Sequence, residues 1–264
     1  MKLQGTRILL TGAGGGIGSA LATQLASKGA TLALLDRHAG DADSPCRGIG
    51  GANCHAVAVD LLDPSARDAA VEQAVATLGG IDLLINCAGL MSFRPFAEED
   101  PATLERLVQL NLVVPMLLAR QVLPRLLAQG HGRIVNIGST FGSIGFAWFA
   151  AYSASKFGLR GLSEALRREL DGSGVEVTYV APRAVRTQLN TGAVYRMAEV
   201  TKMHMDEPGW VAGRVVEAIE SGAKDVYLGF PEKFFARLNG FLPRLVDGGL
   251  RKQNALMAPF AREG

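Results

Sequence analysis

Short apolar runs alternate with longer stretches of helical periodicity along most of the chain. The apolar runs predict seven strands, at residues 6–11, 31–36, 55–59, 81–86, 133–138, 175–180 and 226–228. Helical spacing of apolar positions covers residues 17–28, 64–78, 111–129 and 152–170. Right-handed crossovers between parallel strands place helices on both faces of a sheet. We therefore expect an α/β fold with a doubly wound, mostly parallel seven-stranded sheet in a single domain.

Two segments depart from this alternation. Residues 37–53 are rich in Gly, Pro and Asp, which disfavour a helix, so we expect mostly loop there. Residues 231–264 alternate bulky apolar residues with Arg and Lys at helical spacing, and the string Val246 to Gly249 falls between two such helical stretches. We divide the chain into a main domain, residues 1–230, and an amphipathic helical C-terminal extension, residues 231–264.

Three roles are open for this extension: it packs over a ligand pocket, forms a dimer interface, or lies on a membrane surface as a peripheral contact. Its modest net hydrophobicity and basic charge favour the first two over the third. We expect a homodimer or homotetramer.

Composition narrows the class of protein. The 264 residues are 48% hydrophobic with a net charge of only +2, so we expect no nucleic-acid partner. Cys46, Cys54 and Cys87 lack metal-like spacing, and their odd number without a secretory segment favours reduced thiols, no metal and a cytoplasmic protein. No run of about 18 uninterrupted apolar residues predicts a membrane span.

A glycine loop follows the first predicted strand and opens the first predicted helix, with glycines at positions 12, 14, 16 and 18. Glycine permits a tight turn and close backbone approach to a pyrophosphate, and the helix N-terminus supplies amide donors. Asp36 ends the second strand, where a carboxylate accepts hydrogen bonds from an adenosine ribose and repels a 2′-phosphate. This favours NAD(H), while the neighbouring Arg37 leaves NADP(H) open.

Tyr152 and Lys156 are four residues apart in a predicted helix and share one face. An adjacent ammonium stabilises a phenolate and lowers the pKa of a tyrosine, which suits Tyr152 for acid/base chemistry. Ser139 lies at the end of a predicted strand, where open α/β sheets bind ligands, and can hold a substrate oxygen while Tyr152 exchanges the proton.

These residues together resemble the short-chain dehydrogenase/reductase family over about residues 6–187. The matching motifs are TGAGGGIG at 11–18, Asp60, Asn86-Cys87-Ala88-Gly89, Asn111, Ser139 and YSASK at 152–156. The resemblance implies a Rossmann-like fold and a catalytic tetrad of Asn111, Ser139, Tyr152 and Lys156. In it, Asn111 would orient a water in a proton relay through Lys156 and the cofactor ribose.

The resemblance also implies a set of cofactor contacts. Asp60 would contact the adenine amine, the segment from Asn86 to Gly89 would line the adenosine ribose, and Lys156 would bond the nicotinamide ribose. The whole expected set is Gly12, Gly14, Gly16, Ile17, Gly18, Asp36, Arg37, Asp60, Leu61, Asn86, Ala88, Gly89, Tyr152, Lys156 and Thr187.

The chain departs from the family pattern at two places. Cys87 replaces an asparagine, a small change expected to affect packing only, and Arg183 stands where the family usually has glycine beside the nicotinamide. For Arg183, contact with the cofactor pyrophosphate, contact with an anionic substrate group and simple exposure to solvent all remain open.

Apolar residues are expected around the substrate: Met91, Phe93, Phe141, Ile144, Phe146, Trp148 and Phe149. Residues 188–208 lie where family members carry a substrate lid, and Met197, Met203 and Met205 there suit an adaptable apolar surface. These features favour hydride transfer to or from a hydrophobic ketone, aldehyde or secondary alcohol. The alternatives are an isomerase or dehydratase that uses NAD, and a non-catalytic nucleotide-sensing scaffold.

Overall fold

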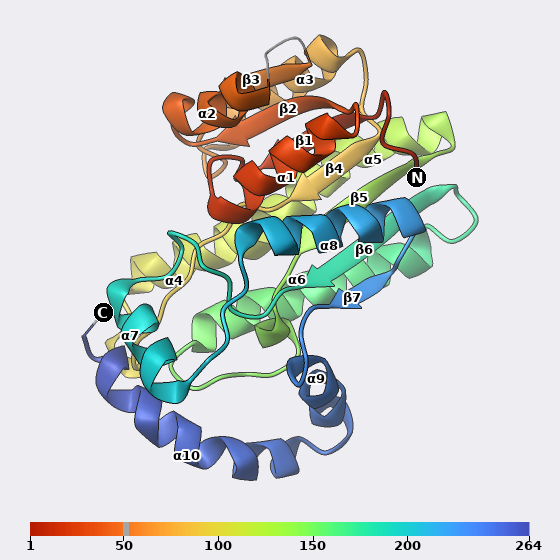
Figure 1. Ribbon diagram of the computed structural model, residues 1–264. Helices are drawn as coiled ribbons and strands as arrows, with labels where there is room; N and C mark the ends of the chain where they lie inside the picture. The colour runs from red at the N-terminus through yellow and green to blue at the C-terminus, as the bar shows by residue number, and fades with distance from the viewer. Residues whose placement is uncertain (50–52, 264) are drawn as a thin grey trace.

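The computed structural model describes residues 1–49 and 53–263, in which a seven-stranded sheet has the order β3-β2-β1-β4-β5-β6-β7 (Figure 1). All strand pairs are parallel. The strands are β1 (Arg7–Thr11), β2 (Thr31–Asp36), β3 (Cys54–Ala58), β4 (Leu83–Asn86), β5 (Gly132–Ile137), β6 (Val175–Ala181) and β7 (Asp225–Tyr227). The predicted α/β class and doubly wound sheet are therefore confirmed.

Helices cover both faces of the sheet (Figure 1). They are α1 (Gly16–Ser27), α2 (Ala39–Ile49), α3 (Pro64–Leu78), α4 (Pro101–Val108), α5 (Val114–Gln129), α6 (Ala150–Glu169), α7 (Gly192–Thr201), α8 (Pro208–Ser221), α9 (Glu232–Phe241) and α10 (Pro243–Ala261). Alternate residues of β1 enter two cores: Ile8 packs with α1 and α8, and Leu9 packs with α3 and α5. Burial on both faces explains why the central strands are almost wholly apolar.

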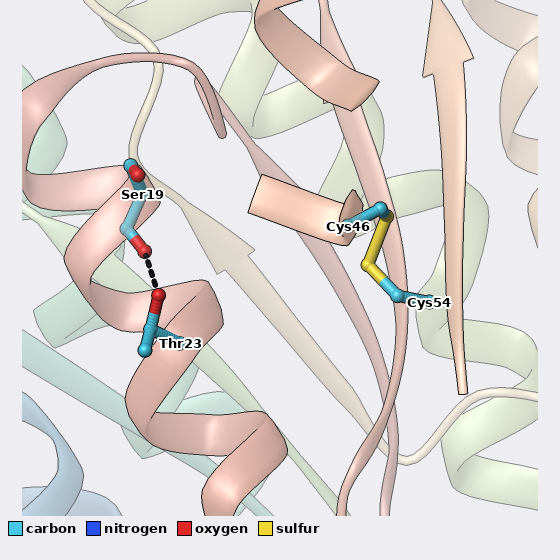
Figure 2. Close-up of a disulfide and its surroundings, with 4 residues drawn as sticks. All are labelled: Ser19, Thr23, Cys46 and Cys54. Carbon is cyan, nitrogen blue, oxygen red and sulfur yellow. Dashed lines mark hydrogen bonds between the residues drawn. A yellow bond between two sulfur atoms is a disulfide. The ribbon is translucent and has the colours of Figure 1, made fainter. Parts of the chain in front are cut away.

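The prediction of a loop at residues 37–53 was wrong for most of that segment. Helix α2 covers residues 39–49 despite an internal Pro45. Cys46 packs in the same apolar core as the buried side chains of α1. A disulfide joins Cys46 to Cys54 at the start of β3, so the expectation of free thiols holds only for Cys87 (Figure 2). Tertiary packing here outweighs weak helix propensity. The remainder of that prediction, at residues 50–52, lies outside the described residues.

The central helix begins earlier than predicted. Helix α4 starts at Pro101, with Asp100 as a cap that accepts a hydrogen bond from the Thr103 amide, and a π-helical turn, Gln109–Val113, joins it to α5. The continuous helix of 29 residues is long and apolar enough to cross a membrane by length and composition. Its α5 part packs Leu118, Val122 and other side chains into the core against the sheet, which explains its apolar character in this fold.

The C-terminal third of the described chain contains four helices whose limits the sequence left open or misplaced. Helix α7 lies inside the predicted lid, and α8, which the sequence analysis did not identify, packs closely on α1. The extension forms α9 and α10, and the string Val246 to Gly249 lies inside α10 rather than between helices. In Figure 1 these two helices lie along one end of the molecule, beyond α7 and β7.

Removing the disulfide should destabilise the α2 and β3 region. In the chain-entropy account, a bridge that closes a loop this short contributes about 2–3 kcal/mol. We expect urea denaturation of the Cys46→Ser/Cys54→Ser variant to show a loss of about 2 kcal/mol. A reductant should lower the midpoint of the parent protein and leave that of the variant unchanged; an unchanged parent midpoint would contradict the pairing.

Candidate active site

The cleft of the candidate site begins where the loops after β1 and β4 meet at the carboxyl edge of the sheet. Gly12 has φ +70°, and a Cβ on it would lie 2.7 Å from the Cα of Ala88. Only glycine allows the two loops to approach so closely. β1 pairs with β2 on one side and β4 on the other, so this is the switch point at which open α/β sheets bind ligands.

A cleft of about 380 Å³ opens at this point. Most of the predicted cofactor residues line it: Gly12, Gly14, Gly16, Ile17, Gly18, Asp36, Arg37, Asp60, Leu61, Ala88, Gly89, Tyr152, Lys156 and Thr187. Helix α1 begins at Gly16 without a side-chain cap, so amide donors of its first turn are available to a phosphate. The donor set and the close glycine packing fit a dinucleotide.

Asn86 is the predicted cofactor residue that the structure places elsewhere. Its side chain is buried beneath the cleft and donates to the Asn136 carboxamide at 2.8 Å, and Asn136 in turn donates to Ser163 at 2.8 Å. The neighbouring Cys87, Ala88 and Gly89 form the wall instead. Since side chains alternate in direction along a strand, Asn86 at the end of β4 faces the interior.

Asp36 fixes the glycine loop as well as facing the cleft. One carboxylate oxygen accepts the Gly14 amide at 2.9 Å, and the other accepts the Arg37 amide at 2.7 Å. Each oxygen keeps a second acceptor site for a ribose hydroxyl. Arg37 is exposed at the rim of the cleft, with its side chain directed to His38.

Tyr152 and Lys156 line this cleft, and Ser139 lies against Tyr152. The Ser139 and Tyr152 side chains are hydrogen-bonded, and Ser139 caps the following turn by accepting the Phe141 amide at 3.1 Å. The Lys156 ammonium donates to the Ile137 carbonyl at 3.0 Å and lies 5.7 Å from the centre of the Tyr152 ring. The helix α6 therefore presents both residues on one face, as their spacing predicts.

Burial determines the protonation of this pair. It raises the pKa of Tyr152 to about 12, opposed by the hydrogen bond to Ser139, and lowers the pKa of Lys156 to about 8. The expectation that the ammonium lowers the pKa of Tyr152 was therefore wrong for the protein alone, because desolvation of the phenolate dominates. At neutral pH Tyr152 carries its proton and Lys156 its charge.

Asn111 lies in the π-helical turn and is fully buried. Its carboxamide accepts the Leu90 amide and donates to the Leu90 carbonyl, both at 2.8 Å, and donates to Ser155 at 3.1 Å. The π turn, a geometry frequent at functional sites, thus aims Asn111 at the loop that carries Gly89. The Asn111 side chain fixes that loop; the proposed water relay stays a prediction.

Tyr179 supports the site although the sequence analysis did not identify it. It is buried in β6, and its hydroxyl donates to the Ser139 carbonyl at 3.1 Å. The sequence signal was a phenol within the predicted strand at residues 175–180, since a buried hydroxyl requires a hydrogen-bond partner.

A second, larger cavity of about 750 Å³ adjoins Ser139 and Tyr152. Five of the predicted substrate residues line it: Met91, Phe141, Ile144, Phe146 and Phe149. Phe93 instead stacks behind Phe149 with ring centres 4.5 Å apart, and the Trp148 indole donates to the Asn254 carbonyl in α10 at 3.2 Å. Met197 and Met203 of the predicted lid line the cavity, whereas Met205 is buried beside it.

Arg183 is held by two carboxylates. Its guanidinium donates twice to Asp206, at 2.9 Å each, and once to Glu232 at 3.2 Å. Gly229 has a left-handed backbone, and a Cβ on it would lie 2.7 Å from the Arg183 Cδ. The absence of a side chain at Gly229 therefore leaves room for the Arg183 side chain. Arg183 thus ties the end of the lid segment to the start of α9, and it also lines a cavity beside Tyr152. Its contact with the cofactor pyrophosphate or with an anionic substrate group stays a prediction.

Comparisons with known proteins agree with this geometry. A profile of the short chain dehydrogenase family matches residues 6–197. The chain is 36% identical over 226 residues to the ketoacyl reductase HetN of a Nostoc species, covering 85% of this chain and 78% of that protein. It is 33% identical over 238 residues to a 2,3-dihydroxy-2,3-dihydro-p-cumate dehydrogenase of Pseudomonas putida, covering 89% and 91%. A 3-ketoacyl-(acyl-carrier-protein) reductase from Brucella melitensis, solved with NADH, has a TM-score of 0.81 at 26% identity, covering 87% and 99%.

Loss of the Arg183 guanidinium should destabilise the protein by about 3 kcal/mol, because Arg183→Met leaves the buried Asp206 carboxylate with only the exposed His204 ring beside it. The matched control is Arg186→Met, which removes the exposed Arg186–Glu207 pair and should cost under about 1 kcal/mol. Urea denaturation measures both. Equal costs for the two variants would refute the structural role of Arg183.

Proposed function

We propose that the chain, which belongs to the short-chain dehydrogenase/reductase family, transfers a hydride between NAD(H) and a hydrophobic ketone, aldehyde or secondary alcohol. One observation carries this proposal: Tyr152 borders both the glycine-loop cleft and the larger apolar cavity. An acid/base group at the junction of a cofactor site and an apolar cavity is placed to act on a carbonyl held between them.

The site residues divide the chemistry between them. When bound in the cleft, a nicotinamide cofactor supplies or accepts the hydride. In reduction, Ser139 donates a hydrogen bond to the carbonyl oxygen and Tyr152 gives its proton to that oxygen as the carbon gains the hydride. In oxidation, Tyr152 takes the alcohol proton as the carbon loses the hydride. Lys156 stabilises the negative charge that develops on Tyr152 during reduction.

The raised pKa of Tyr152 suits the proton donor of the reductive direction. A phenol that holds its proton at neutral pH is ready to donate, whereas oxidation needs the phenolate, which burial disfavours. Lys156 stays charged at neutral pH, and its ammonium offsets the free-energy cost of forming the buried phenolate.

The preference for NAD(H) over NADP(H) rests on Asp36. A ribose 2′-phosphate would bring a negative charge beside a carboxylate whose oxygens already hold the Gly14 and Arg37 amides in place. The Arg37 side chain at the rim of the cleft donates to the His38 ring and is not held toward the position of the ribose.

The Tyr152→Phe variant tests the function itself. We expect the parent protein to reduce bulky hydrophobic ketones with NADH, read at the nicotinamide absorbance, and to prefer them over short ketones. Tyr152→Phe should lower kcat at least about a thousandfold, because the proton donor is lost, while NADH binding measured by fluorescence changes little. Turnover that survives in this variant would refute the role of Tyr152.

Changing Asp36 to Asn should shift cofactor selectivity. The amide oxygen still accepts the Gly14 amide, but the charge that repels a 2′-phosphate is removed. We expect the ratio of kcat/KM with NADPH to that with NADH to rise at least about tenfold, the equivalent of about 1.4 kcal/mol. A parent protein that already prefers NADPH would contradict the assignment of NAD(H).

The reductive rate should depend on pH through Lys156. Below about pH 8 the ammonium is charged and supports the developing phenolate; as pH rises through the pKa of Lys156, near 8, that support is lost while Tyr152 stays protonated. We therefore expect kcat to be flat from about pH 6 to 7 and to fall above about pH 8. The falling limb should be absent from the low residual rate of Lys156→Met; a parent profile that is flat to pH 10 would disprove this dependence.

A further inference from the structure

The most exposed apolar side chains of the described chain lie at the two ends of α9, before its first residue and at its turn into α10. We call residues 230–245 the hairpin tip. Phe241 is 85% exposed, Phe230 79% and Leu245 63%, and all six residues from Gly240 to Leu245 are exposed. The large apolar residues exposed in this segment are Phe230, Phe234, Phe235, Phe241, Leu242 and Leu245. In Figure 1 the two blue helices project at one end of the molecule, away from the sheet.

Positive charge accompanies this apolar surface. Residues 232–253 contain five cations, Lys233, Arg237, Arg244, Arg251 and Lys252, all of them exposed. Of the two carboxylates in that stretch, Glu232 is bound by Arg183, which leaves Asp247. The five cations form no ion pair within the described part of the chain. Residues 232–253 thus carry an excess of three positive charges in a protein whose net charge is only +2.

The larger cavity reaches this surface. Phe230, Phe235 and Leu245 of the hairpin tip both line the cavity and are exposed to solvent. Phe241 and Leu242, at the end of the turn, are exposed and do not line it. An apolar cavity that leads from Tyr152 therefore ends beside exposed aromatic and aliphatic side chains on a basic surface.

The positive charge of this surface favours a lipid membrane over a second copy of the chain as the binding partner. A second copy related by a two-fold axis would bring the same cations together, and that like-charge contact opposes association. Anionic lipid headgroups complement Arg and Lys, and acyl chains accept Phe and Leu, which is the pattern of helices that bind at membrane interfaces.

We propose that the hairpin tip docks on an anionic lipid bilayer, with Phe241 and Leu242 among the acyl chains, Arg237 and Arg244 at the headgroups, and the cavity mouth facing the membrane. The docking rests on the exposed residues and their charge alone. Its consequence, that apolar substrate enters the cavity from the bilayer, rests on the proposed function.

Vesicle co-sedimentation of the full chain tests the docking. We expect the protein to bind vesicles that contain phosphatidylglycerol at least tenfold more tightly than pure phosphatidylcholine vesicles, with binding that weakens as salt rises. Phe241→Ser/Leu242→Ser should weaken binding at least fivefold, and Arg237→Glu/Arg244→Glu should abolish the preference for phosphatidylglycerol. NADH binding by each variant, measured by fluorescence, verifies that it is folded.

Matched control variants alter the same chemistry at other places. Phe96→Ser removes an aromatic residue that is exposed outside the hairpin, and Lys2→Glu/Lys224→Glu reverses two exposed charges that precede β1 and β7 at the opposite edge of the sheet. Both controls should bind vesicles as the parent protein does. Turnover of a small water-soluble ketone should be the same in Phe241→Ser/Leu242→Ser as in the parent, because neither side chain lines the cavity.

Three results would overturn the docking: a parent protein that does not sediment with phosphatidylglycerol vesicles, hairpin-tip variants that sediment as the parent does, or a hairpin-tip variant that turns a dimer into a monomer while vesicles are not bound. The last result would assign the surface to a second copy. Because sedimentation needs no substrate, a protein that binds vesicles but reduces no ketone would refute the proposed function and leave the docking intact.

Discussion

The parallel pairing of β1 with β2 on one side and β4 on the other is the constraint on which the site depends. It brings the loops after β1 and β4 together at one edge of the sheet, and both loops line the cleft that opens there. Because every strand of the described sheet runs in the same direction, Asp36 at the end of β2 and Ser139 after β5 reach that edge too. The chemistry is assembled from residues far apart in the sequence by strand direction alone.

Desolvation gives the two central residues their protonation states. It raises the pKa of one group and lowers that of the other, since in each case it disfavours the charged form. Burial lowers the pKa of Lys156 only to about 8, so its ammonium keeps its charge at neutral pH, and it donates a hydrogen bond to the Ile137 carbonyl at 3.0 Å. A more deeply buried lysine would lose its charge at neutral pH, and with it the ammonium that lies 5.7 Å from the centre of the Tyr152 ring.

The sequence predicted what local periodicity and short motifs determine. All seven strands and the segments around Gly12, Ser139 and Tyr152 were identified because strand alternation and fixed spacing are read within a few residues. The failures involve contacts across the fold. Helix α2 depends on packing and a disulfide, and Arg183 depends on Asp206 and Glu232, 23 and 49 residues further along the chain.

The prediction that the pKa of Tyr152 is lowered failed for the same reason, because this pKa depends on the folded structure. The spacing of Tyr152 and Lys156 identified the pair correctly, but the balance between desolvation and charge depends on how deeply the pair is buried. Asn86 was likewise placed on the right strand, while the direction of its side chain required the pleat of β4 and its partner Asn136.

The order of the parts along the chain affects how such a protein can diversify. The acid/base residues are complete by Lys156, whereas the far wall of the larger cavity comes from α9 and α10, at the very end. The extension is tied to the earlier part of the chain by polar contacts, among them Arg183 to Glu232, Trp148 to Asn254 and Asn239 to Ser143. Met257 and Ala261 of α10 also pack in one apolar cluster with Tyr152. Natural variation after about residue 230 can therefore reshape the cavity wall without replacing an acid/base residue, provided that the packing against Tyr152 is kept.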